Sequence, residues 1–240
     1  MTRDALTAGG VCVQSTSMLR AKMLLDGLRR LGGRRYGRTA FWYLGVERLV
    51  VGVVEPGDDE PLLTACATVT GQAQTPFSAG LLEAALVAGS RGLDHVAALD
   101  ERFCALVPTP GEGVAPAAVR TSVEVPGPSS TLIRADREAL EWAVRLFAEA
   151  RLRLVCVECA DVARVRLCRY LGHASGFTPE VAPPARGPDP LAAVSVATQW
   201  ETRAAELGGL LGVPVGLALG RFDVPVADPL DGTDASAQRP

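Results

Sequence analysis

The chain has 240 residues, of which 48% are hydrophobic and 21% charged, and its formal net charge is −3. A chain of this size buries roughly 70–75% of the surface that it exposes when unfolded, so it needs no disulfide or metal to hold a core. Its apolar content excludes disorder over most of its length. The weakly negative charge argues against a general nucleic-acid binder.

The first 38 residues are predicted to form a leader that contains a basic amphipathic helix. Apolar side chains recur there at helical spacing, at Leu19, Met23, Leu24, Leu28 and Leu31. This stretch has seven basic residues and one acid, Asp26, so its charge is +6 and the remainder of the chain has a charge of −9. The basic residues are Arg20, Lys22, Arg29, Arg30, Arg34, Arg35 and Arg38. Two interpretations stay open: a solvated surface helix, or a helix that lies on an anionic membrane surface.

Residues 39–172 are predicted to form an α/β core, which begins with strands. Runs rich in β-branched and aromatic residues predict strands at Thr39–Glu47, Arg48–Glu55 and Leu62–Thr70. A helix is expected at Ser78–Ser90, and one or two strands at Val96–Val107. The Pro- and Gly-rich residues 108–130 predict a loop with a possible short strand at 119–125.

The second part of this core has a clear helix–strand–helix order. Asp136 is the expected N-cap of a helix, which a buried strand at Leu152–Val157 and a helix at Asp161–Leu171 follow. This order predicts a layered α/β fold. Beyond it we expect a Pro-rich linker at 173–190, a helical segment at 191–222, whose helix runs from about Leu191 to Gly212, and a loose tail at 223–240.

The six cysteines are scattered, and no secretory signal is recognised, so we expect free thiols in a reducing cytosol. Cys156 and Cys159 have the spacing of a redox or zinc pair. A zinc site needs a second pair of ligands, and the two histidines, His95 and His173, are not spaced to supply it. We therefore favour buried structural thiols. No apolar run reaches the length of a membrane span.

Other short motifs favour structural interpretations. Ala88–Gly92, with Ser90 at its centre, resembles a broken nucleophile elbow, and Asp94-His95 could supply the partners of a catalytic triad. The elbow needs a strand before the serine, and here a helix precedes it. We therefore favour a glycine turn at the C-terminus of that helix. Gly111-Glu-Gly113 is a weak phosphate motif, and the acidic run at 231–234 is read as a solvated turn.

Glycine recurs every fourth residue at Gly208, Gly212, Gly216 and Gly220. On a helix this spacing makes a groove that a second backbone can approach closely, although Pro214 would kink such a helix. A tightly packed terminal helix broken by a turn is the interpretation that we favour.

Three segments together resemble the actin-like PilM, MshI and HofM proteins of type IV pilus and related assembly systems. They are the basic stretch Leu25–Arg38 with the hairpin Thr39–Glu55, the helix–strand–helix block Thr131–Leu171, and Gly216-Leu-Ala-Leu-Gly220. The resemblance implies an α/β actin-like (ribonuclease H-like) layered fold with a mixed sheet. It also implies a cytoplasmic scaffold that binds the cytoplasmic tail of an inner-membrane partner, and some members bind ATP.

The chain departs from that family where nucleotide would bind. The resemblance implies an Asp and small residues in the first hairpin turn, where this chain has Gly45-Val46-Glu47-Arg48-Leu49. The Pro-rich stretch between Leu171 and Leu191 has no second phosphate hairpin, so the second half is predicted to be truncated. Without both loops there is no cradle for phosphates, and we predict no cofactor.

The sequence therefore predicts a non-catalytic scaffold of a pilus or type II secretion-like assembly, with no catalytic, cofactor or metal site. The leader arginines and Lys22 are its candidate membrane-surface residues. Two alternatives stay open: a small α/β enzyme or ligand-binding domain that uses Cys159 or Asp100-Glu101, and an actin-like protein that binds ATP.

Overall fold

A computed structural model of the chain describes residues 37–58, 60–70, 77–108, 122–126, 131–172 and 188–221. Nine strands occur in this part: β1 (Thr39–Leu44), β2 (Arg48–Glu55), β3 (Leu62–Thr70), β4 (Asp94–Leu99), β5 (Cys104–Pro108), β6 (Ser122–Pro126), β7 (Thr131–Asp136), β8 (Arg153–Cys159) and β9 (Ser195–Val196). The described α-helices are α3 (Phe77–Val87), α4 (Arg137–Glu149), α5 (Ala160–Tyr170), α6 (Glu201–Leu207) and α7 (Gly212–Arg221).

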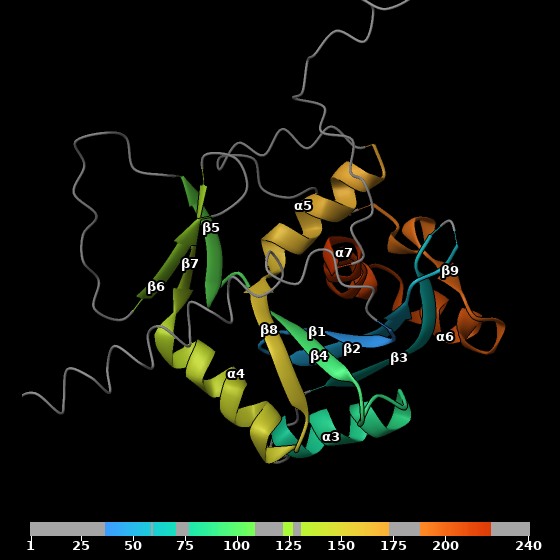
Figure 1. The fold of residues 1–240 in the computed structure, drawn as a ribbon, viewed down its shortest axis with the longest axis horizontal. Coiled ribbons are helices and arrows are strands. Elements are labelled where there is room, and N and C mark those ends of the chain that lie inside the picture. Colours follow the sequence, from blue (N-terminus) through green and yellow to red (C-terminus); the bar gives the residue numbers. More distant parts are fainter. Residues whose placement is uncertain are drawn as a thin grey trace, which may run out of the picture.

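A mixed sheet of order β8-β4-β1-β2-β3-β9 forms the centre of the molecule (Figure 1). Strands β1, β2 and β3 form an antiparallel meander, and β4 and β8 continue it in parallel with β1. An antiparallel meander followed by two parallel strands is the mixed sheet of the ribonuclease H-like fold. The predicted α/β class and mixed sheet are confirmed.

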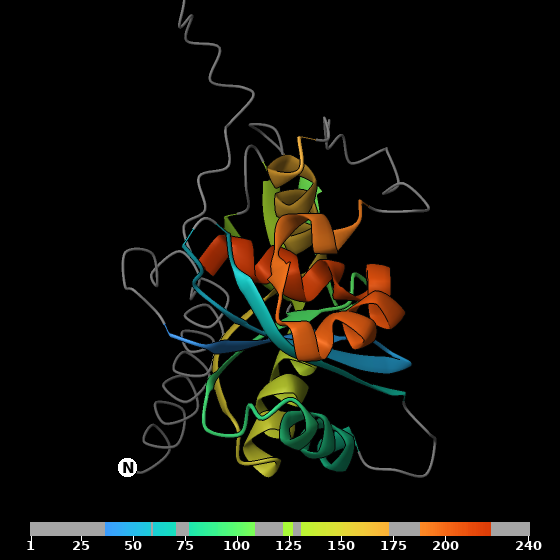
Figure 2. The ribbon, with the colours of Figure 1, turned by 90° about the vertical axis from the view of Figure 1, so that its right-hand side faces the viewer.

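Helices cover both faces of this sheet (Figures 1 and 2). Helices α3 and α4 lie on one face, where their apolar side chains pack with Trp42 of β1. Helices α5, α6 and α7 lie on the other, where they pack with Phe41. Neighbouring side chains of a strand point to opposite faces. Both faces of this sheet are buried, so β1 is mainly apolar and β2 is apolar between its charged end residues.

A second sheet, of order β5-β7-β6, lies beside α4 and α5 (Figure 1). The sequence predicts strands near β5 and β6 but not β7, which is the middle strand. The predicted cap of the next helix is confirmed, since the Asp136 carboxylate accepts a hydrogen bond from the Glu138 amide at 3.0 Å.

The helical stretch predicted from about Leu191 to Gly212 is interrupted several times. This segment contains 3₁₀ turns at Pro190–Ala193, Thr198–Trp200 and Gly208–Leu211, the short strand β9 and helix α6. Two local causes break it: β9 pairs with β3, and Gly208 adopts a φ of +47° where α6 ends.

The glycines that follow line one face of α7, which packs on α5. A Cβ at Gly216 would lie only 2.0 Å from the carbonyl oxygen of Ala163, and one at Gly220 would lie 2.6 Å from the Arg166 guanidinium. The glycine groove and the tightly packed terminal helix are therefore the same feature, and its occupant is α5.

Candidate functional site

The carboxyl ends of three parallel strands meet at one edge of the central sheet. Leu44 of β1 lies beside Leu99 of β4, which lies beside Cys159 of β8. In open α/β sheets this edge is where ligands usually bind. A cavity of about 480 Å³ opens here, between the β1–β2 turn, the loop after β4, α5 and the start of α7.

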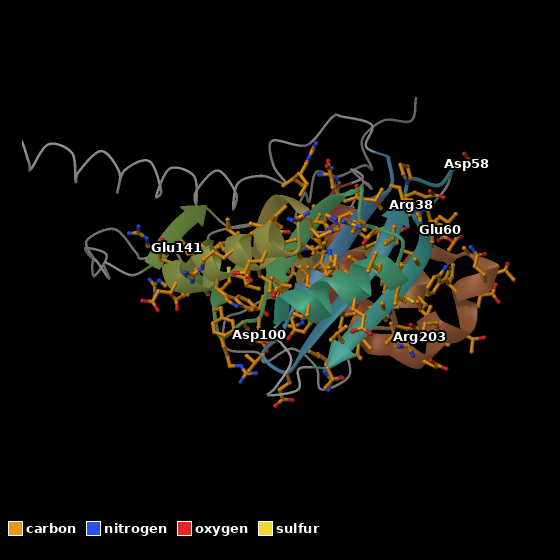
Figure 3. The ribbon with its side chains drawn as sticks, turned by 90° about the horizontal axis from the view of Figure 1, so that it is seen from below. Arg38, Asp58, Glu60, Asp100, Glu141 and Arg203 are labelled. Carbon is orange, nitrogen blue, oxygen red and sulfur yellow. The ribbon has the colours of Figure 1, made fainter. Side chains whose placement is uncertain are left out.

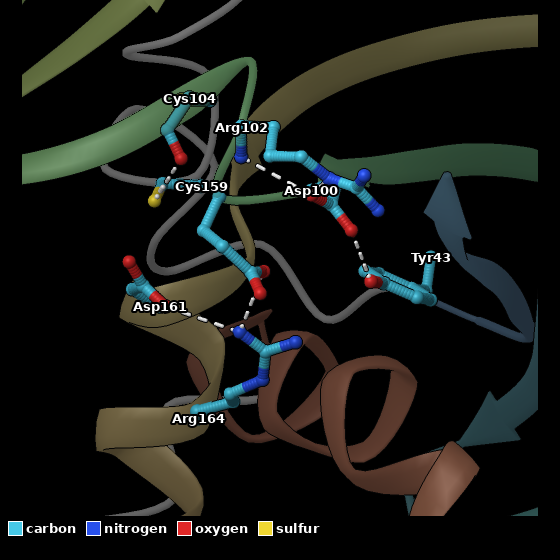
Figure 4. A network of polar contacts seen from close by, with 8 residues as sticks. Tyr43, Asp100, Arg102, Cys104, Cys159, Asp161 and Arg164 are labelled. Atoms are coloured by element: carbon cyan, nitrogen blue, oxygen red, sulfur yellow. Dashed lines mark hydrogen bonds and ion pairs between the residues drawn. The ribbon is translucent and has the colours of Figure 1, made fainter. Parts of the chain in front are cut away.

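The centre of this edge is a buried carboxylate, Asp100, directly after β4. The Tyr43 hydroxyl donates a hydrogen bond to it at 2.6 Å, and Arg102 donates from its backbone N–H at 3.1 Å and its Nε at 3.2 Å (Figure 4). Burial alone would raise the pKa of Asp100, but these donors outweigh it and hold the pKa below its ordinary value. Burial and the Asp100 carboxylate raise the pKa of Tyr43, so the phenol stays protonated.

A second group of charges surrounds Arg164 on α5. Its guanidinium lies 3.0 Å from a Glu101 carboxylate oxygen, 3.1 Å from one of Asp161, and 5.8 Å from the centre of the Tyr43 ring. Burial raises the pKa of Asp161 although Arg164 opposes the shift. The three acids at this edge are thus held by two arginines and a tyrosine, and we call the six residues the edge network.

The β1–β2 turn closes the cavity. The Gly45 amide is already used, since it donates to the Arg48 carbonyl at 3.0 Å. A Cβ at Gly45 would meet the Tyr43 ring at 2.9 Å, so a larger residue there would displace that ring. The other side chains of the turn are Val46 and Glu47, one apolar and one negative, and neither suits a phosphate.

The proposed cysteine pair does not form a site. Cys156 and Cys159 lie on β8 three residues apart, and they pack into cores on opposite faces of the sheet. The Cys159 thiol donates to the Cys104 carbonyl at 2.9 Å, and both residues are buried. The interpretation as structural thiols is confirmed for these two. In the described part of the chain, no group of His, Cys, Asp and Glu residues is placed to hold a metal.

The residues that resemble a nucleophile elbow form a helix end. Gly89 has a φ of +61°, and the Ser90 amide and hydroxyl both point back to the Ala85 carbonyl, at 2.8 and 3.3 Å. His95 is fully buried and accepts a hydrogen bond from the Trp42 indole at 2.9 Å. Burial lowers its pKa to about 4, although a backbone contact with Ser90 opposes this shift. The favoured glycine turn is confirmed.

The predicted membrane-surface residues other than Arg38 lie outside the described residues, as do Gly111–Gly113 and Asp231–Asp234. Arg38 is exposed, and its Nε donates to the Thr64 hydroxyl at 3.1 Å. Figure 3 shows it at the same end of the sheet as Asp58 and Glu60.

Sequence reasoning named Asp100 and Glu101 but missed their partners. Tyr43 could have been found as the one hydroxyl near the end of a strand that is otherwise apolar. Arg164 stands three residues after Asp161, the spacing of neighbours on a helix. Arg102 adjoins the acids in sequence. No signal showed that the three would converge, because convergence depends on how β1, β4 and α5 are arranged.

No protein-family model matches the chain, and no curated protein matches it in sequence. Among solved structures, it is similar to a chain of the PilM–PilN type IV pilus biogenesis complex. The TM-score is 0.54 at 13% identity, over 79% of this chain and 99% of that one. The fold of this protein is that of the PilM-like chain, and the predicted structural resemblance is confirmed.

Two further structures are more distant. The cytoplasmic domain of EpsL, an inner-membrane component of the type II secretion system of Vibrio cholerae, has a TM-score of 0.40 at 13% identity, over 53% of this chain and 59% of that one. A protein of Bacteroides thetaiotaomicron with an actin-like ATPase fold has a TM-score of 0.38 at 7% identity, over 56% of each chain. Among the described helices, none has the length and apolarity that crossing a bilayer requires.

Proposed function

We propose that this protein is a non-catalytic scaffold of a type IV pilus or type II secretion-like assembly. It acts on the cytoplasmic side of the inner membrane and binds the cytoplasmic tail of an inner-membrane partner. The observation that carries the proposal is the fold similarity to the PilM–PilN complex, which extends over 99% of that chain.

The contacts of the edge network fit a structural role in such a scaffold. Asp100 already accepts from Tyr43 and Arg102, and Glu101 and Asp161 share Arg164. These contacts tie β1, the loop after β4 and α5 together, which is a structural role.

The alternative of an enzyme that uses Cys159 has little support, because this thiol is buried and bonded to the Cys104 carbonyl. Alkylation under native conditions is therefore expected to leave Cys159 unmodified. The alternative of ATP binding is tested by calorimetry with Mg-ATP. We expect no heat of binding, and clear binding would contradict the proposal.

The direct test of the proposal uses the full chain and peptides. The cytoplasmic tails of single-span inner-membrane pilus and secretion proteins from the same genome are synthesised, and binding to each is measured by biolayer interferometry. One tail is expected to bind, and its scrambled version is not. If every tail binds no better than its scrambled control, the proposed partner class is wrong.

A further inference from the structure

Helix α3 has an unusual composition for a helix at the surface. Among its eleven residues, Phe77–Val87, Glu83 is the single charged one. A helix that is apolar on all sides is normally buried on all sides. The inner face follows this rule, since Leu81, Ala84 and Ala85 are buried against the sheet.

The outer face of α3 is open to solvent within the described part of the chain. Leu86 and Val87 are 55% and 59% exposed, and Val46, at the opposite edge of the sheet, is the other exposed large apolar residue described. Leu86 continues a stripe with Ala79, Leu82 and Glu83 at the spacing of one helix face. Figure 3 views the molecule from this side, with α3 in front. Adjacent exposed apolar residues on an apolar helix indicate a surface that another segment covers.

The leader joins the body close to this surface. Thr39, the first residue of β1, pairs with Asp94, the first residue of β4. A turn of six residues, 88–93, leads from the end of α3 to Asp94, so the leader and the exposed end of α3 meet at one edge of the sheet. Leu31 precedes Gly37 by six residues, which span about 20 Å when extended. A helix is about 10–12 Å across, so this reach is enough to pass around α3 to its outer face.

The leader also has the matching chemistry. Its apolar residues recur at helical spacing, and it carries a charge of +6. Exposed charges of both signs lie near its proposed position: Glu83 on α3 and Glu149 at the end of α4, which packs beside α3, are acidic, and Arg91 in the turn after α3 is basic.

We propose that residues 19–31 pack in the same molecule on the outer face of α3, where their apolar stripe covers Leu86 and Val87. In this position the arginines that flank the stripe point away from the body. The leader is then an additional layer of the fold that presents its basic side outward, instead of a free tail.

Site-specific photo-crosslinking in the full chain tests the position. The photoreactive residue p-benzoylphenylalanine replaces Leu86, and the matched control carries it at Val46, which is 39% exposed at the other edge of the sheet. We expect crosslinks from position 86 to residues 19–31 in a product of monomer mass, and none to these residues from position 46. Crosslinks in a product of double mass would assign the surface to a second copy and overturn the proposal. A yield to the leader no higher than from position 46 would also overturn it.

A second measurement tests the apolar stripe itself. The double variant Leu24→Asp, Leu28→Asp is compared with Ala5→Asp, Ala8→Asp, which adds the same charge to the leader outside the stripe. We expect the first pair to lower the crosslinking yield from position 86 at least fivefold and to raise hydroxyl-radical oxidation of Leu86 and Val87, and the second pair to leave both unchanged. Equal effects of the two pairs would contradict packing through the stripe.

Discussion

Tyr43 is the residue that links the two halves of the edge network. Its hydroxyl donates to Asp100, and its ring lies beside the Arg164 guanidinium. Sequence alone identified the two acids after β4 but could not show that a phenol from another strand satisfies one of them. Hydrogen-bond partners far apart in sequence depend on strand register, and register emerges only when the whole sheet is paired.

Replacing Tyr43 by Phe is expected to lower the free energy of unfolding by about 1–2 kcal/mol at pH 7, because Asp100 stays buried and loses a donor. Urea denaturation measures the change. Tyr170→Phe, which removes the hydroxyl of a half-buried tyrosine outside the network, is the control and should change stability by less.

The pKa of Asp100 is lowered in the folded state, so the hydrogen bond from Tyr43 stabilises the protein above the ordinary pKa of Asp, about 3.9, and this contribution is lost as pH falls. An effect that persists undiminished at pH 3 would contradict this origin.

The burial of His95 makes the stability of the fold depend on pH. Its pKa falls from the ordinary 6.5 to about 4 in the fold, so as pH falls the unfolded chain takes up a proton before the folded chain does. The protein should therefore lose stability between about pH 6.5 and pH 4, by about 3 kcal/mol in total from this group.

The comparison that isolates this effect is His95→Gln, whose amide can still accept the hydrogen bond from Trp42. The slope of unfolding free energy against pH should decrease in this variant within that window. His173→Gln removes the other histidine and should keep the slope of the unaltered protein. If both variants keep that slope, His95 is not the titrating group.

At the scale of elements, periodicity predicted the long strands well and the short ones poorly. Strands β2 and β3 begin and end where the sequence predicts, because both combine β-branched residues with a Pro- and Gly-rich turn between them. Strand β7 pairs with β5 and with its neighbour β6, and the two-residue β9 exists through pairing with β3, which is distant in sequence. A segment of two residues, such as β9, carries too few side chains to show a period.

The contact between α5 and α7 leaves no room for an additional methyl group. Gly216→Ala would place a methyl group against the Ala163 carbonyl, and the two helices would have to separate. We expect a loss of about 3 kcal/mol or more in unfolding free energy, since backbone yields less readily than a side chain. Gly209→Ala is the control, because open space surrounds that position, and it should change stability by about 0.5 kcal/mol or less. Equal losses, measured by urea denaturation, would mean that α7 moves freely on α5.

At the scale of the whole molecule, the fold class was predictable because the chain alternates strands and helices, whereas the proposed contact with a membrane rests on a charge distribution. The net charge of −3 hides a leader of +6. The fold of the body is similar to that of a chain of a pilus assembly complex, and its edge network ties β1, the loop after β4 and α5 together.

If the leader brings this scaffold to the inner membrane, binding should depend on its arginines and on anionic lipid. Each arginine near such a surface contributes about 1 kcal/mol, so replacing Arg29, Arg30, Arg34 and Arg35 by Ser should weaken vesicle binding by more than about a hundredfold. Liposome flotation of the full chain measures this, with vesicles of 30 mol% phosphatidylglycerol or of phosphatidylcholine alone. The charge-matched control replaces four exposed arginines of the body, Arg91, Arg145, Arg153 and Arg203, by Ser and should retain most of the binding. Binding should also fall as salt is raised, because the charges at the surface are screened. Equal flotation of both variants, or binding without anionic lipid, would assign the leader charges to solvent and leave the body to reach the membrane through its protein partner.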